Sequence, residues 1–129
     1  MTYQVSHAQG ELLAQVRPGV TTPITLFAAD ELRVEITLVL AVVTAGTVAI
    51  DFFHDDDGTT YDNTTIIGAI SKAKAGEPIG AFQAQHPGSG IMIKPGGSLG
   101  VQIDSADDAT ISVYGVTETL AERVRGLVG

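Results

Sequence analysis

The side chains best suited to chemistry in this chain lie in the stretch HDDDGTTYDN, residues 54–63. It holds one glycine, Gly58, and four carboxylates, those of Asp55, Asp56, Asp57 and Asp62. A cluster of carboxylates can bind calcium, can supply an acid and a base to an enzyme, or can simply keep a turn in water. The spacing of the surrounding residues is what separates these three alternatives.

The spacing does not fit an EF-hand. That loop needs oxygen ligands at positions 1, 3 and 5, glycine at position 6 and glutamate at position 12. With Gly58 at position 6, Asp55 and Asp57 fall at positions 3 and 5, but Phe53 and Thr64 fall at positions 1 and 12. An irregular calcium loop stays open. Because Asp-Gly favours turns, we expect instead a connecting loop whose four aspartates face solvent and bind no structural metal.

Other catalytic motifs are equally weak. The stretch GGSLG, residues 96–100, matches a nucleophile elbow, but the strand-like VQID follows where that motif needs a helix. A glycosidase pair needs one carboxyl in an apolar pocket, and the chain has no Trp to form a sugar platform. The three histidines, His7, His54 and His86, are far apart, and there is no Cys. We therefore expect no enzyme activity, no metal site and no cofactor.

Composition narrows the class of protein. The 129 residues suit one domain, and the net charge of -8, with only seven scattered cations, disfavours nucleic acid and anionic membranes as partners. No basic start precedes an apolar run at the N-terminus, so we expect no signal peptide and synthesis in a cytoplasm. The longest apolar stretch, residues 38–50, is too short to span a bilayer.

Short apolar runs separated by Gly, Pro, Asp and Ser recur about every ten residues, which is typical of a β-sandwich or barrel. The predicted strands are 24–29, 32–43, 47–53, 64–70, 79–85, 91–94, 98–104 and 110–116. Residues 32–43 begin with Leu32, Val34, Ile36 and Leu38 on one face and then become continuously apolar, as if both faces were covered. The short link 44–46 predicts a hairpin with the next strand.

Alternation also predicts a core. The residues expected to face inward are Val34, Ile36, Leu38, Ile50, Phe52, Ile93, Val101, Ile103, Ile111 and Val113.

The two ends differ from this pattern. Residues 1–19 give mixed signals and are predicted to be an N-terminal arm outside a sandwich domain that covers 20–117. Residues 118–129 are predicted to be a short C-terminal helix or tail, because Thr119 and Glu122 form a capping box. Leu120, Val124 and Leu127 then fall on one helical face.

The strand region resembles small virion proteins of tailed bacteriophages, the head decoration or cement proteins. A strand TPITLF leads to a long strand, then to a strand ending in an acidic loop, over residues 20–117. The later motif positions are Ile91, Ile93, Pro95, Gly96, Ser98, Leu99, Val101, Ile103, Ala106, Thr110, Ser112, Val113, Gly115 and Val116. The resemblance implies an all-β, jelly-roll-like sandwich that is often trimeric, and it carries no catalytic residues.

We therefore expect a decoration protein on the capsid surface, a homotrimer that binds the major capsid protein and stabilises the shell. The alternatives are a tail or fibre module that recognises a host glycan, and a sandwich that binds calcium or a small molecule. The resemblance does not cover the ends, and their apolar residues need a partner surface to avoid water. The expected interface residues are Leu12, Leu13, Val16, Arg17, Leu120, Arg123, Val124, Arg125 and Leu127.

Overall fold

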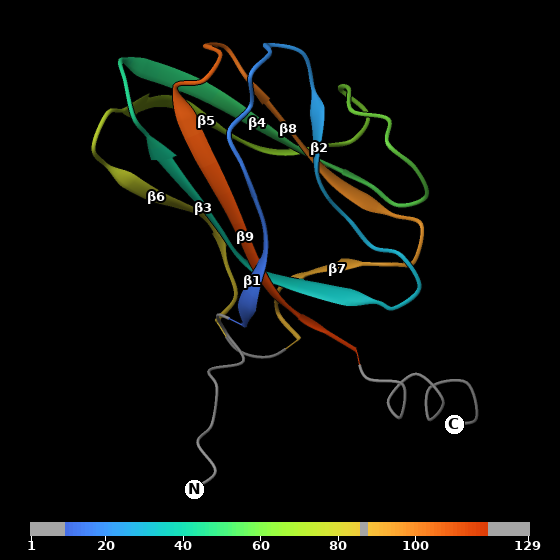
Figure 1. The fold of residues 1–129 in the computed structure, drawn as a ribbon. Coiled ribbons are helices and arrows are strands. Elements are labelled where there is room, and N and C mark those ends of the chain that lie inside the picture. Colours follow the sequence, from blue (N-terminus) through green and yellow to red (C-terminus); the bar gives the residue numbers. More distant parts are fainter. Residues whose placement is uncertain (1–9, 86–87, 119–129) are drawn as a thin grey trace, which may run out of the picture.

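Nine antiparallel strands make up the part of the chain that the computed structural model describes, residues 10–85 and 88–118 (Figure 1). The strands are β1 (Glu11–Val16), β2 (Ile24–Ala28), β3 (Val34–Val43), β4 (Thr47–Asp55), β5 (Ile66–Lys74), β6 (Pro78–Gln83), β7 (Ile91–Ile93), β8 (Ser98–Ile103) and β9 (Ala109–Thr117). These described ranges contain no helix. The prediction of an all-β sandwich is confirmed, and all eight predicted strands exist.

The strands form two sheets. Sheet A has the order β1-β9-β3-β6, with the short β7 also paired to β3, and sheet B has the order β2-β8-β4-β5. Their inner faces pack against each other around apolar side chains that are shielded from water, among them Phe52, Val101, Ile103 and Ile111. Nine of the ten predicted core residues are buried; the exception is Leu38.

A β-bulge explains why Leu38 was predicted wrongly. Val34 and Ile36 face the core as expected, but the pairing of β3 with β9 shifts register between Ile36 and Leu38. Thr37 is the extra residue, and it is buried with its hydroxyl donating to the carbonyl of Tyr114 at 3.3 Å. A shift of one residue exchanges the two faces of a strand. Beyond the bulge Val39, Ala41 and Val43 therefore fill the core, and Leu38, Leu40 and Val42 turn outward.

The predicted hairpin between residues 32–43 and 47–53 is wrong. β3 belongs to sheet A and β4 to sheet B, so the link 44–46 crosses from one sheet to the other. Gly46 makes this corner with a φ of 66°, a conformation that glycine adopts without steric cost. Backbone hydrogen bonds from Thr44 to Asp108 (2.8 Å) and from Gly76 to Val43 (2.9 Å) tie the corner to two other connections between the sheets.

The predicted N-terminal arm is also wrong over residues 11–16. This segment is β1, an edge strand of sheet A that pairs with β9, so the sandwich begins near residue 11 rather than at residue 20. Sequence alone obscured it because a bulge between Leu12 and Ala14 breaks the alternation. The predicted C-terminal helix falls on residues 119–129, outside the described residues.

The described chain enters and leaves the sandwich at the same end (Figure 1). Gly10 lies so close to Gly115 that a Cβ on Gly10 would stand 2.2 Å from the Gly115 carbonyl oxygen. On the other side of β9, Glu118 and Arg33 share two hydrogen bonds of 2.9 Å, one backbone to backbone and one from the Arg33 N–H to the Glu118 carboxylate. Residues 10 and 118 are therefore both held at this end of the sandwich.

Candidate functional site

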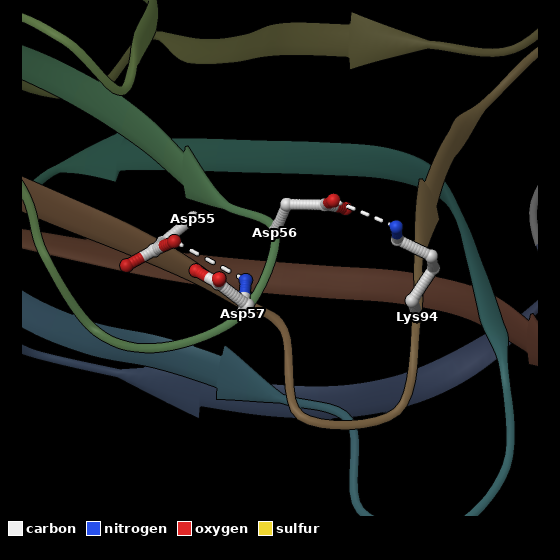
Figure 2. A network of polar contacts seen from close by, with 4 residues as sticks. All are labelled: Asp55, Asp56, Asp57 and Lys94. Atoms are coloured by element: carbon white, nitrogen blue, oxygen red, sulfur yellow. Dashed lines mark hydrogen bonds and ion pairs between the residues drawn. The ribbon is translucent and has the colours of Figure 1, made fainter.

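The acidic loop follows directly from β4 and returns the chain to β5. Its first carboxylate, Asp55, is the last residue of β4 and is only 8% exposed. The backbone N–H groups of Thr60 (2.7 Å) and Asp57 (3.2 Å) donate to it, and Figure 2 shows the second of these bonds. These bonds stabilise the charged form, first that from Thr60, and lower the pKa of Asp55. The prediction that Asp55 faces solvent is wrong; its carboxylate shapes the loop.

Asp62 plays a similar part at the far side of the loop. Its carboxylate accepts hydrogen bonds from the Thr64 hydroxyl and from the Thr64 backbone N–H at 2.8 Å. These bonds, the hydroxyl first, lower the pKa of Asp62. Thr65 closes the turn with hydrogen bonds to Thr60 and Asp62. Asp62 is exposed as predicted, but its charge is engaged within the loop.

The remaining two aspartates are exposed. Asp56 forms an ion pair with Lys94 at 2.7 Å, and both side chains are more than half exposed. Figure 2 shows the Asp56 side chain directed toward Lys94 and away from Asp55 and Asp57. Within residues 10–85 and 88–118, no group of three or more His, Cys, Asp or Glu side chains is placed to hold a metal ion. The four carboxylates of this sequence cluster therefore do not converge on one site.

Tyr61 holds this loop on the outer face of sheet B, and sequence analysis did not single it out. Its hydroxyl shares hydrogen bonds with Thr25 (2.8 Å) and Ser98 (2.7 Å). Its ring lies against Phe53, with centroids 5.9 Å apart, and over Gly100, where an added Cβ would stand 2.5 Å from the ring. The sequence feature that could have indicated this contact is Gly100, which pairs with Phe53 and has no side chain, so an aromatic ring can lie over it.

Ser98, the serine of the GGSLG stretch, is bound into the same network. It is 1% exposed, and its hydroxyl donates to the carbonyl of Gly58. A buried serine engaged on both sides is a structural residue rather than a nucleophile. The one histidine in the described part of the chain, His54, has a buried Nε2 atom without a hydrogen-bond partner among the described residues.

The predicted interface residues are only partly described. Leu13 and Val16 pack against the core of their own chain, whereas Leu12 is 51% exposed. The Arg17 Nε–H donates to the Asp107 carbonyl at 2.7 Å, so this guanidinium braces the turn before β9. The other five predicted residues, Leu120, Arg123, Val124, Arg125 and Leu127, lie outside the described residues.

Shallow concavities of about 320–350 Å³ are lined by described residues of both sheets. One of about 320 Å³ on the outer face of sheet B includes Asp51 and Asp104. The Asp104 carboxylate there accepts the Ala49 backbone N–H at 2.8 Å, and the Gln102 amide donates to the Thr21 carbonyl at 3.0 Å. These polar groups are thus used to bind neighbouring parts of the chain.

Comparison of the chain with models of protein families, with curated proteins and with solved structures found no match. In the described ranges, no helix has the length and apolar character needed to cross a membrane.

Proposed function

We propose that this chain is a head decoration protein of a tailed bacteriophage, a jelly-roll homotrimer that binds the major capsid protein on the capsid surface. The observation that carries the proposal is the strand order. Apart from the short β7, the two sheets β1-β9-β3-β6 and β2-β8-β4-β5 each interleave early and late strands of the chain. This order supports the jelly-roll part of the proposal, because a jelly roll also divides eight strands between two sheets and occurs in viral capsid proteins.

The chemistry of the polar groups supports a binding role over catalysis. The two aspartates with lowered pKa values, Asp55 and Asp62, accept hydrogen bonds from their own loop. A catalytic acid at neutral pH needs a pKa shifted in the opposite direction. The carboxylates of Asp55 and Asp62 therefore fix the conformation of the acidic loop, and their lowered pKa values keep both of them negatively charged at neutral pH.

The position of the chain ends supports attachment from one end of the sandwich. Gly10 and Glu118, the residues next to segments 1–9 and 119–129, lie at the same end of the sandwich. Leu120, Val124 and Leu127, together with Arg123 and Arg125, supply apolar area and positive charge on an otherwise acidic chain. Each copy would contribute a modest interface, and repetition over the lattice would convert these contacts into shell stability.

The test is binding to undecorated phage heads by variants that lack residues 1–9 or 119–129. The deletion stops before β1 because residues 11–16 belong to sheet A. We expect at least one deletion to abolish binding while the circular dichroism spectrum is kept, and an Asp56→Asn variant, altered on the exposed loop, to bind as the full chain does. Normal binding by both truncated proteins would contradict attachment through the ends.

Copy number per virion separates the leading proposal from the alternative. A decoration protein is present on the whole head lattice, whereas a tail or fibre module that recognises host glycan is present in few copies. Quantitative mass spectrometry of purified virions against the major capsid protein measures this ratio. A ratio near that of tail components would overturn the decoration proposal.

A further inference from the structure

The outer face of sheet A is unusually apolar. Strand register places the outward side chains of its four main strands next to one another, since Leu38 pairs with Tyr114 and Leu12 pairs with the same residue from the other side. Its apolar or aromatic outward side chains are Leu12, Leu38, Leu40, Val42, Tyr114 and Val116. Polar outward residues lie among them, and Ser112 on β9 stands between Leu40 and Gln15.

Charge is nearly absent from this face. In the described strands of sheet A, Glu35 is the one charged residue that the register places among the outward positions. Its carboxylate accepts the backbone N–H groups of Gly88 (2.7 Å) and Gly90 (2.8 Å), so it is bound to the adjacent loop. The chain as a whole carries a net charge of -8. A face with a single charged side chain, itself bound to the adjacent loop, is where two copies of an acidic chain can approach with little repulsion.

The outer face of sheet B has a different character. Asp51 and Gln102 point outward from its central strands, and Tyr61 of the acidic loop covers the part near Gly100. Antiparallel sheets commonly bury one face and leave a polar face in water. The central strands of sheet B follow this pattern, although Ile66 and Ile67 on its edge strand β5 are 43% and 39% exposed. In sheet A, no described strand covers the outer side chains, and Leu12 and Met92 are 51% and 42% exposed.

The size of the face fits an interface between proteins. At about 3.4 Å per residue and about 4.8 Å between strands, the four main strands of sheet A present on the order of 500 Å². A monomer's largest apolar patch is typically about 300–600 Å² and is often functional, and a stable interface buries about 800 Å² per partner. The whole face, its polar positions included, therefore has more than half of the area that a stable interface buries on each partner.

We infer that the outer face of sheet A is the surface through which copies of this chain associate. The apolar side chains of β3 and β9 from neighbouring copies pack together and exclude water, with Leu40 near the centre. The inference deepens the proposed function, because it rests on the homotrimer and names the surface that forms it.

The test is the mass of the purified full chain in solution, measured by light scattering after size-exclusion chromatography. We expect the wild type to have about three times the mass of one 13.4 kDa chain. A Leu40→Lys variant places a charge in the middle of the face, and we expect it to be monomeric with an unchanged circular dichroism spectrum. The matched control is Ala69→Lys, at an exposed outward position of β5 in sheet B, which should keep the wild-type mass.

A milder variant, Leu40→Thr, keeps a residue suited to strands and covers the case in which Leu40→Lys fails to fold. We expect it to raise the dissociation constant at least tenfold. A monomeric wild type at tens of micromolar overturns the inference, and so does a folded Leu40 variant that associates as tightly as the wild type. Because the assay contains no capsid, a protein that associates through this face but does not bind heads would contradict the proposed function alone.

Discussion

The Oδ2 atom of Asp55 lies 2.7 Å from the backbone nitrogen of Thr60, which joins the end of β4 to the middle of the acidic loop. The other carboxylate oxygen accepts the N–H of Asp57. A carboxylate that accepts backbone N–H groups in this way substitutes for hydrogen bonds that an isolated loop would make to water. The densest charge in the sequence therefore has a conformational role.

The first prediction concerns acid. The folded-state pKa of Asp55 is lowered, so its contribution to stability is present above the unfolded pKa of about 3.9 and is lost as the pH falls through the folded pKa. We expect the melting temperature to fall more steeply below about pH 4 in the wild type than in Asp55→Asn. Thermal melts between pH 7 and pH 2.5 measure this difference. Asp56→Asn, at the exposed ion pair with Lys94, should keep the wild-type slope.

The second prediction concerns the hydroxyl of Tyr61. In Tyr61→Phe the ring can still lie against Phe53 and Gly100, but the hydrogen bonds to Thr25 and Ser98 are lost. A hydrogen bond contributes about 0.5–1.5 kcal/mol net, so we expect a loss of about 1–2 kcal/mol in the free energy of unfolding. Urea denaturation followed by circular dichroism measures it. A change below the error of that method would mean that the hydroxyl is hydrated equally well in the variant.

The sequence predicts those parts of the fold that depend on residue alternation within one strand. It does not predict the parts that depend on how two strands pair. Alternation of apolar and polar residues predicts the strand ranges and nine of the ten core residues. In β9, for example, the polar Ser112 separates the two inward side chains of Ile111 and Val113. Thr37 was not identifiable as a bulge, since its exchange of faces depends on how β3 pairs with β9. The same bulge turns Leu38, Leu40 and Val42 outward, so the prediction that both faces of this continuously apolar run are covered is not met by the strands of this chain.

The candidate site shows the same limit. The sequence predicts the loop and its turn chemistry, and the spacing of its residues alone excludes an EF-hand. The sequence does not distinguish Asp55 from Asp56. Adjacent residues in a strand point to opposite faces, so the position at which β4 ends determines which aspartate is buried. Tyr61 was overlooked because its partners, Thr25 and Ser98, are 36 and 37 residues away.

The third prediction concerns the core. Ile103 is fully buried on β8, so Ile103→Ala removes buried methyl groups and leaves a cavity. Such truncations cost about 2–5 kcal/mol. The matched control is Ile66→Ala on β5, where the side chain is 43% exposed and a change within about 0.5 kcal/mol is expected. Equal losses in the two variants, measured by urea denaturation, would contradict the assignment of Ile103 to the inner face.

The last prediction concerns His54, the one described histidine. Its Nε2 atom is buried without a hydrogen-bond partner among the described residues, and an unpaired buried polar atom costs about 1–3 kcal/mol. Replacing it by an apolar side chain of similar size removes that cost, so His54→Leu should be as stable as the wild type or more stable. His54→Asn leaves an amide in the same surroundings and should be less stable than His54→Leu. Urea denaturation at pH 7.5 compares the two variants, and a large loss of stability in His54→Leu would show that the ring nitrogen has a partner that stabilises the fold.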